Sequence, residues 1–306
     1  MGPELTLTTI VLLIISAIIH ALWNLIGKRE NPSPSFFITA SAVSCLCLAP
    51  ALFAHRGMAG QFSENVWLLL AATGFFQAIY YTGLAGAYRS GHLSIAYPLA
   101  RSAPVIMVAI VTLLIGTGHP PNTQAVIGMA LIALGGLVLP VERPRDWKLK
   151  DYIHASSLFA LIAAAGTTGY SIIDDSALRI LRSTPALHSS RITVTLVYAF
   201  FENASALAWL TLIVLLGRIK GVPSPKPAKN SSGSAALAGI GICAAYALVL
   251  LAMTFAKNVS YIVAFRQLSI PIGAILGITI LREPRYPAKL AGMAIMFAGL
   301  VLVAIH

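Results

Sequence analysis

Residues 5–26 read LTLTTIVLLIISAIIHALWNLI and contain no charged side chain. A helix rises about 1.5 Å per residue, so a stretch of this length crosses a hydrocarbon core about 30 Å thick. The stretch therefore predicts a transmembrane helix. It is too long for the apolar region of a signal peptide, and no basic segment precedes it, so we expect it to be retained as the first helix.

Similar apolar stretches fill the rest of the chain. Of the 306 residues, 58% are hydrophobic and only 10% are charged, whereas soluble domains carry about 25% charged residues. The predicted spans are 5–27, 35–54, 65–88, 92–115, 122–141, 153–178, 190–217, 235–256, 260–281 and 287–305. We predict an all-α, multi-pass membrane protein with about ten transmembrane helices.

Several functional classes are excluded by what the sequence lacks. The net charge of +11 does not indicate nucleic-acid binding, because the basic residues lie almost entirely between apolar stretches. The three cysteines lie inside apolar stretches and suggest neither disulfides nor a metal site. The phosphate loop of ATP motors and the HExxH and GxSxG motifs are absent. We expect no catalytic residues, no cofactor and no metal.

The chain contains an internal repeat. A shift of 167 residues aligns Pro104 with Pro271, and a shift of 164 aligns GMALIALGGLVL (128–139) with GMAIMFAGLVLV (292–303). The polar segment between the two copies sets the boundary. We predict a first five-helix repeat over 1–141, a connecting loop over 142–152 and a second five-helix repeat over 153–306.

Five spans per repeat is an odd number, so the second repeat must cross the membrane in the opposite sense. Inverted repeats are typical of secondary transporters, whose substrate sites lie near the membrane midplane between the repeats. The fold prediction therefore leads to a functional one, the transport of a small solute.

The charges between the spans predict an orientation. The loops after the first, third, fifth, seventh and ninth spans hold fourteen of the 21 Lys and Arg residues, whereas the other loops hold five. The positive-inside rule places the richer side in the cytoplasm, which leaves both termini outside.

Three segments carry a resemblance to a known family: HALWNLIGKR (20–29), AYPLARSAPVIMVAI (96–110) and LREP (281–284). With the two five-helix halves, the chain resembles the EamA family of the drug/metabolite transporter superfamily. The resemblance implies a ten-helix permease of the inner membrane, often an exporter, with the fifth and tenth spans outside the central cavity. It also implies cytoplasmic termini, which disagrees with the charge count, so the orientation stays open.

Two arginines inside predicted spans are candidates for substrate binding. Arg101 and Arg266 precede the aligned Pro104 and Pro271, so we expect the two guanidiniums at similar depth. Arginine binds carboxylates and phosphates through paired hydrogen bonds. In the alternative reading, each arginine pairs with an internal acid and only holds helices together. Pro98, Pro104 and Pro271 are candidate hinges, because proline removes a helical hydrogen bond.

Acidic residues inside the spans are candidates for proton coupling. Asp174 and Asp175 lie late in the sixth span, and adjacent helical residues point about 100° apart, so both cannot face one partner. Alternatively, both lie at the membrane interface near Arg179 and Arg182. Glu202 is a further acid in the seventh span.

Other polar and aromatic residues are candidates for lining a cavity. His20, Trp23 and Asn24 share one face of the first helix, and Gln77 and Tyr81 share one of the third. Tyr97 lies one turn before Arg101, and Tyr246 is a weaker candidate. For all of them, helix packing is an equal alternative. Gly128, Gly135, Gly292 and Gly299 indicate close helix contacts, either within the chain or in a homodimer.

The sequence thus favours a secondary transporter over other membrane proteins. Its paired arginines favour anionic or zwitterionic metabolites, such as amino acids or organophosphorus compounds, with a proton or another ion as coupling partner. The alternatives are an exporter of cationic drugs, a lipid-modifying membrane enzyme, and a membrane scaffold or receptor. The expected partners are the solute and the lipid bilayer, not nucleic acid.

Overall fold

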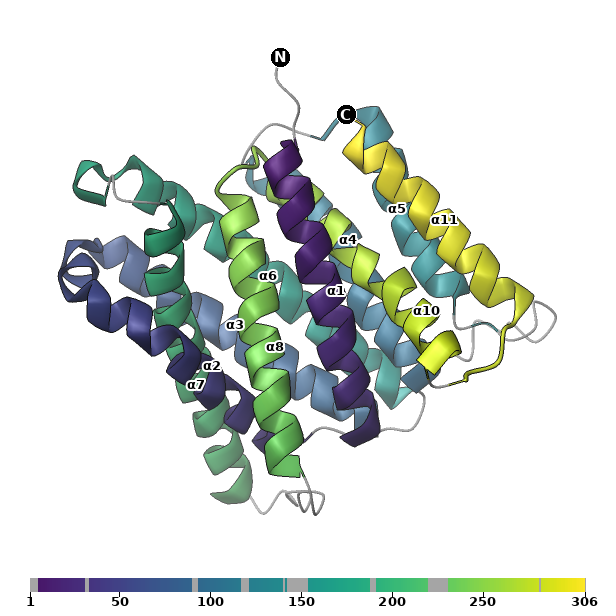
Figure 1. Ribbon diagram of the computed structural model, residues 1–306, viewed down its shortest axis with the longest axis horizontal. Helices are drawn as coiled ribbons and strands as arrows, with labels where there is room; N and C mark the ends of the chain where they lie inside the picture. Colours follow the sequence, from purple (N-terminus) through teal and green to yellow (C-terminus); the bar gives the residue numbers. More distant parts are fainter. Residues whose placement is uncertain are drawn as a thin grey trace.

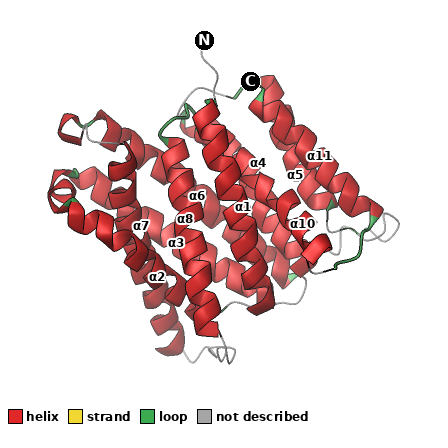
Figure 2. Cartoon of the chain, in the orientation of Figure 1, coloured by secondary structure: helices red, strands yellow, loops and turns green. Residues whose placement is uncertain are grey.

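A computed structural model of the chain describes residues 5–30, 33–89, 93–116, 121–139, 141, 154–187, 191–219, 231–280 and 282–305. In these ranges the chain forms helices joined by short loops and no strands (Figure 2). Eight helical stretches are long and apolar enough to cross a membrane, and two shorter apolar helices cover Leu99–Ile115 and Thr123–Val138. The prediction of an all-α membrane protein with about ten spans is confirmed.

The helix bounds agree with the predicted spans to within a few residues. The helices are α1 (Leu7–Glu30), α2 (Pro34–Ala54), α3 (Glu64–Arg89), α4 (Leu93–Ile115), α5 (Thr123–Val138), α6 (Ala155–Ser183), α7 (Arg191–Ile219), α8 (Ser231–Met253), α9 (Val259–Phe265), α10 (Ser269–Ile280) and α11 (Pro287–Ala304). Short 3₁₀ turns are η1 (Arg56–Gln61), η4 (Pro185–Leu187) and η5 (Arg266–Leu268). The ninth span therefore consists of α9, η5 and α10 in succession.

Local sequence explains where several helices begin. The side chains of Ser33, Asn122 and Asn258 accept hydrogen bonds from the backbone N–H groups of the first turns of α2, α5 and α9. Proline occupies the first position of α2 and of α11, where its missing N–H costs no helical bond. These residues satisfy donors that a helix start leaves without partners.

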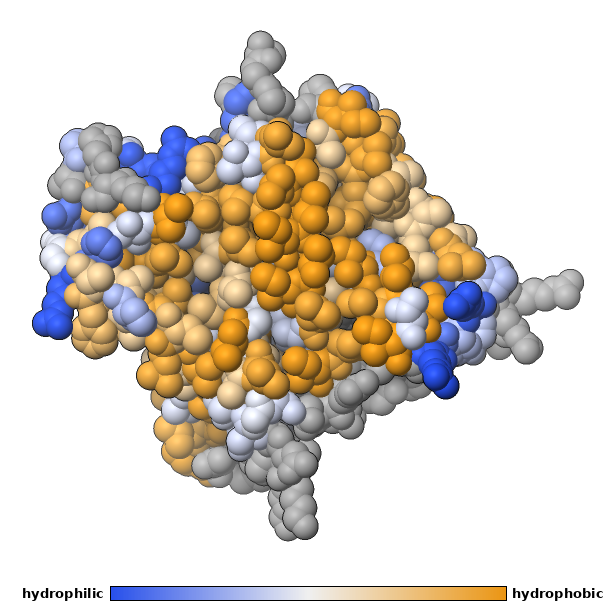
Figure 3. All heavy atoms as spheres, in the orientation of Figure 1, coloured by the Kyte–Doolittle hydropathy of each residue, from blue (hydrophilic) through white to orange (hydrophobic). Residues whose placement is uncertain are grey.

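The outer surface of the bundle is apolar, as a lipid-facing surface must be. On α1 the exposed side chains recur at helical spacing: Leu7, Val11, Ile14, Ile15, Ile18 and Leu22. Figure 3 shows an orange surface across the middle of the molecule, with blue residues toward its edges. Such a large exposed apolar area would be unfavourable in water. It fits a hydrocarbon surrounding.

Helices from the two predicted repeats interleave. α1 packs against α8 and α10, and α6 packs in the same way against α3 and α4. Likewise, α2 contacts α8 as α7 contacts α3. In Figure 1 the start of α1 and the end of α11 lie at the same end of the bundle. These neighbours are those that an inverted repeat would give, and one shared bundle holds both repeats. The predicted boundary at 142–152 lies outside the described residues.

α5 and α11 form a close pair at one edge of the bundle (Figure 1). A Cβ added to Gly135 would lie 2.7 Å from the carbonyl oxygen of Gly292, and one added to Gly128 would lie 2.7 Å from that of Gly299. Real Cβ atoms do not approach backbone so closely. Of the two roles considered for these glycines, the structure gives them the contact within the chain.

Three arginines cap the end of α8, where the chain turns into α9. Arg182 donates to the carbonyl oxygen of Met253 at 3.3 Å, Arg191 to that of Thr254 at 3.3 Å, and Arg179 to that of Lys257 at 2.6 Å. Met253 is the last residue of α8, and Thr254 and Lys257 lie in the loop between α8 and α9. Three of the five basic residues on the less positive side thus have a structural role, and the orientation stays a prediction.

A bulky residue in place of Gly135 tests the α5–α11 contact. Gly135→Leu should destabilise the protein by about 1–3 kcal/mol, because the side chain must push the helices apart. Gly217→Leu on α7 is the control, since a Cβ at Gly217 meets nothing within 4 Å. The measurement is the unfolding temperature in detergent. Equal effects of the two substitutions would contradict the close packing.

Candidate functional site

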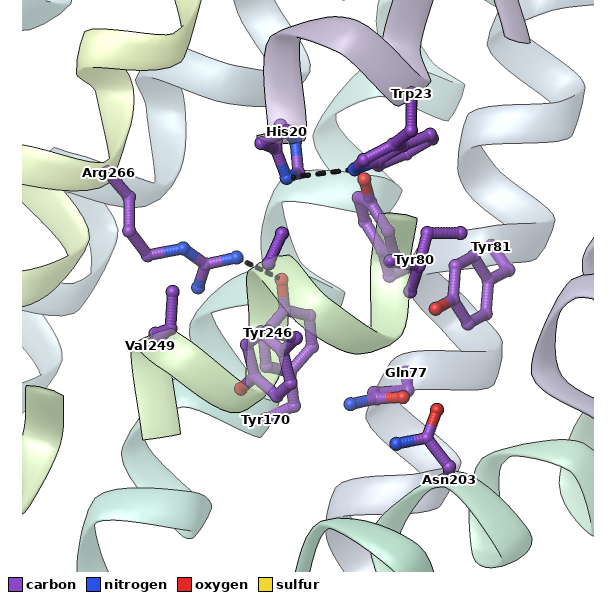
Figure 4. A pocket seen from close by; sticks show the side chains of 12 residues that line it. His20, Trp23, Gln77, Tyr80, Tyr81, Tyr170, Asn203, Tyr246, Val249 and Arg266 are labelled. Atoms are coloured by element: carbon purple, nitrogen blue, oxygen red, sulfur yellow. Dashed lines mark hydrogen bonds between the residues drawn. The ribbon is translucent and has the colours of Figure 1, made fainter. Parts of the chain in front are cut away.

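A small cavity lies where six elements meet near the middle of the bundle (Figure 4). It is lined by residues of α1, α3, α6, α7, α8 and η5: His20, Trp23, Gln77, Tyr80, Tyr81, Tyr170, Asn203, Ile242, Ala245, Tyr246, Val249 and Arg266. Of the described residues of α5 and α11, none lines it. Both predicted repeats contribute to the cavity.

Helical spacing explains why these residues meet. On α8 the lining residues are spaced at i, i+3, i+4 and i+7, and on α3 at i, i+3 and i+4. Each of the two helices therefore turns one continuous stripe toward the cavity. Most of the side chains that line the cavity are aromatic or polar, whereas the surface that faces outward is mainly aliphatic.

The free space in the cavity is small in this conformation. Its free volume for the centres of water-sized molecules is about 30 Å³. One water needs about 10–15 Å³ by this measure, so the space suits two or three waters and not a metabolite. A solute that binds here requires the surrounding helices to separate.

The ninth span tightens into a 3₁₀ turn where it reaches the cavity. α9 ends at Phe265, one 3₁₀ turn follows, and α10 begins at Ser269, so the span remains helical throughout. Pro271 lacks the N–H that would bond to the carbonyl of Gln267, which favours the 3₁₀ turn at this point. Pro104, at the aligned position, leaves α4 helical from Leu93 to Ile115. Hinge motion at these prolines stays a prediction, and the side chain of Pro98 lies outside the described residues.

Arg266 is the first residue of this 3₁₀ turn and lines the cavity. This arginine is 6% exposed, and its Nη2 donates to the hydroxyl of Tyr170 at 3.3 Å. Its guanidinium carbon lies 5.1 Å from the ring centroid of Tyr246 and 5.9 Å from that of Tyr170. Its Nη1 is buried without a hydrogen-bond partner. Within the described part of the chain, Arg266 forms no ion pair with a carboxylate.

Arg101 contacts the residue that follows this turn and is not among the cavity-lining residues. Its Nη2 donates to the hydroxyl oxygen of Ser269 at 2.7 Å, and that hydroxyl donates to the carbonyl oxygen of Arg266 at 3.0 Å. Ser269 therefore joins the two arginines, and Arg101 supports the backbone that carries Arg266. Neither arginine is ion-paired with an acid among the described residues, and Arg101 instead links α4 to α10 through Ser269.

Asp174 is the acid near the cavity that accepts the most side-chain hydrogen bonds. It is fully buried, and three hydroxyl groups donate to it: Thr73 of α3 at 2.7 Å, Tyr198 of α7 at 2.7 Å and Tyr246 of α8 at 2.5 Å. A carboxylate that accepts several hydrogen bonds is stabilised in its charged form. Asp174 thus connects α6 to three other helices.

Asp175 faces away from this network. It forms an ion pair with Arg179, one turn further along α6, with 2.8 Å between the nitrogen and the carboxylate oxygen. Of the two readings of this acid, the structure favours the interfacial one, because Asp175 is not among the cavity-lining residues and Arg179 is 40% exposed in its side chain. The predicted role in proton coupling has no support from its position.

Glu202 is a second buried acid beside the cavity. Gln77 donates from Nε2 to its Oε1, and its Oε2 is buried without a partner. Gln77 lines the cavity, so one side chain separates Glu202 from the space within. Figure 4 shows the amide groups of Gln77 and Asn203 next to each other.

Of the three residues predicted to share a face of α1, two line the cavity and one does not. His20 and Trp23 line the cavity, and Trp23 donates from Nε1 to Nδ1 of His20 at 3.3 Å. Nε2 of His20 is buried and unpartnered. Asn24 instead donates to the backbone carbonyl of His20 at 2.8 Å and does not line the cavity.

The predicted residues of the neighbouring helices have different outcomes. Tyr81 lines the cavity and stacks on Phe37, with 4.8 Å between the ring centroids. Gln77 and Tyr246 line the cavity as predicted. The side chain of Tyr97 lies outside the described residues.

Several residues of the site were missed by the sequence analysis: Thr73, Tyr170, Tyr198 and Asn203. Three of them could have been found from the sequence, because each lies four residues before a polar residue that was among the candidates. The pairs are Thr73 and Gln77 on α3, Tyr170 and Asp174 on α6, and Tyr198 and Glu202 on α7. Residues four apart share a helix face, so three helices each bring two polar groups inward.

The arrangement of helices is shared with a solved protein. A structure described only as "Crystal structure of protein" matches 97% of this chain and 96% of its own chain, with a TM-score of 0.68 and 18% sequence identity. The chain is a multi-pass, all-helical membrane protein. At this identity the likeness concerns the fold alone. No protein-family model matches the sequence, and no curated protein matches it.

Replacing Asp174 tests the central hydrogen bonds. Asp174→Ala leaves three buried hydroxyls without their acceptor, at about 1–3 kcal/mol for each that finds no other partner. Asp175→Ala is the matched control, because its ion pair with the partly exposed Arg179 is worth about 1 kcal/mol or less. Thermal unfolding in detergent should show a clearly larger loss for Asp174→Ala. An equal or larger loss for Asp175→Ala would contradict this assignment.

Proposed function

We propose that the protein is a secondary transporter that moves a small anionic or zwitterionic metabolite across the inner membrane through the central cavity. The observation that carries this proposal is the guanidinium of Arg266. It is buried, it faces the cavity, and its Nη1 is without a partner.

The physical argument is that an unbalanced buried charge is costly. A cation in a medium of low polarity needs a counter-charge or several hydrogen-bond acceptors. Arg266 has one hydroxyl and two aromatic rings, and it reaches Asp174 only through the Tyr246 side chain that bonds to it. A carboxylate or phosphonate on the solute would supply the missing acceptor. The unpartnered Nε2 of His20 offers a second polar contact.

The architecture supports transport over a static role. The cavity lies between helices of both predicted repeats, as the substrate sites of secondary transporters do, and the 3₁₀ turn of the ninth span forms part of its wall. Its small volume fits a closed state of a site that opens in turn to each side. With the loose sequence resemblance, this supports a relation to the EamA family of drug/metabolite transporters.

A second candidate solute is a cationic aromatic compound. Five aromatic side chains line the cavity, and aromatic faces attract cations. Glu202 lies behind Gln77 and would add a negative charge. Against this candidate, Arg266 holds a positive charge on the same cavity wall, and like charges repel at this depth.

Thermal unfolding with a panel of solutes tests the proposal. The panel contains L-glutamate, L-phenylalanine, methylphosphonate, glucose 6-phosphate and tetraphenylphosphonium, and a ligand that binds the folded state raises its unfolding temperature. We expect an anion or zwitterion to stabilise the wild type. Arg266→Ala should weaken its binding about 10- to 100-fold, the range for losing a hydrogen bond to a charged group.

Two further variants make the result specific. Arg101→Ala should reduce binding less, because Arg101 acts through Ser269 and the backbone of Arg266. Arg56→Ala, in the exposed turn η1, should leave binding unchanged. Flux of the bound solute in proteoliposomes then tests transport. Stabilisation by tetraphenylphosphonium alone would overturn the anionic assignment, and binding without flux would overturn transport.

A further inference from the structure

The two buried acids near the cavity have opposite surroundings. Asp174 accepts three hydroxyl hydrogen bonds, whereas Glu202 accepts one amide hydrogen bond and has an oxygen with no partner. Both side chains are fully buried. Stabilisation of a buried carboxylate depends on the donors and cations around it. By this criterion the charged form of Asp174 is better stabilised by its neighbours than that of Glu202.

No cation compensates Glu202 at close range. Among the described residues it forms no ion pair, and the attraction of Arg266 through space is opposed by the repulsion of Asp174. The charged groups that act on it are Asp174 of α6 and Arg266 of η5. The other titratable groups around it are thiols and phenols: Cys45 of α2, Tyr81 of α3, Tyr198 of α7, and Cys243 and Tyr246 of α8. η1 also packs on α7, and its Arg56 is exposed.

We propose that Glu202 is the proton-binding site of the protein and that its proton binds together with the anionic solute. The proposal rests on the function proposed above. In the closed conformation Glu202 is a neutral carboxylic acid, because a buried charged oxygen without a partner costs more than a neutral one. Gln77 connects it to the cavity wall.

The sign of the coupling follows from the charges. A deprotonated Glu202 places a second negative charge behind the wall, in addition to Asp174, and repels an anion that approaches Arg266. Protonation removes this repulsion, so the proton and the anion each raise the affinity of the other, as linkage requires. Solute and proton therefore move in the same direction, from the more acidic side of the membrane to the more alkaline side.

An infrared measurement tests the proton site without any solute. At neutral pH the detergent-solubilised wild type should show the C=O stretching band of a buried protonated carboxyl group. Glu202→Gln should lose this band, and Glu64→Gln, at the exposed start of α3, should keep it. A wild type without the band, or a Glu202→Gln variant that retains it, would overturn the proton site, whatever the protein transports.

The pH dependence of binding tests the coupling. The probe is the anion of the panel that binds best, with L-glutamate preferred because its charge is constant across the neutral range. Wild-type affinity should fall as pH rises, by up to about tenfold per pH unit while Glu202 titrates. Glu202→Gln should bind with nearly constant affinity, and Glu64→Gln should behave as the wild type.

The outcomes separate the two proposals. Affinity that rises with pH, or a Glu202→Gln variant with the wild-type pH dependence, would overturn the coupling while the anion site stands. If the infrared band is assigned to Glu202 and no anion binds, the proposed function fails and the proton site stands. If Glu202→Gln does not fold, a measurement on the wild type takes the place of this variant. Calorimetry of anion binding in two buffers then shows how many protons the protein takes up. Absence of uptake at the pH where affinity falls would overturn the coupling.

Discussion

The carboxylate of Asp174 is the interaction on which the centre of the protein depends. A bundle that faces lipid cannot rely on the hydrophobic effect to join its helices, so close packing and hydrogen bonds between helices must do so. Asp174 accepts hydrogen bonds from three helices other than its own, and Tyr246, one of the donors, also lies under Arg266. The side chains of Asp174, Tyr246 and Arg266 therefore form one connected unit. At the edge of the bundle, where no such network exists, α5 and α11 pack instead through facing glycines.

This central unit also explains how a positive charge is held in the cavity. Arg266 sits at the 3₁₀ turn between α9 and α10, and Ser269 connects this turn to Arg101 of α4. The pseudo-symmetric arginines therefore differ in role: one faces the cavity and the other supports it. Their spacing from the aligned prolines already differs, three residues against five.

The fold was predictable from sequence because transmembrane helices leave a strong local signal. Length and hydrophobicity placed all ten spans, and the aligned prolines anticipated matching neighbours in the two repeats. The site was predicted only in part. Periodicity found His20, Trp23, Gln77 and Tyr81, but whether a polar group faces a cavity or its own helix depends on neighbours far along the chain. Asn24 bonds to its own helix, Arg101 reaches Ser269, and Asp175 meets Arg179. The coordination of Asp174 by three helices has no counterpart in local sequence.

Access to the cavity from both sides of the membrane is the most direct test of transport. In a variant with Cys45, Cys47 and Cys243 replaced by Ala, Val249→Cys places one thiol on the cavity wall beside Arg266. Membrane-impermeant thiol reagents are added to vesicles of each orientation, with Ser63→Cys in the exposed segment before α3 as a control that reacts from one side only. We predict that Val249→Cys reacts from both sides and that a bound anion slows both reactions. Reaction from one side alone, with and without the anion, would contradict a transporter and indicate a static pocket.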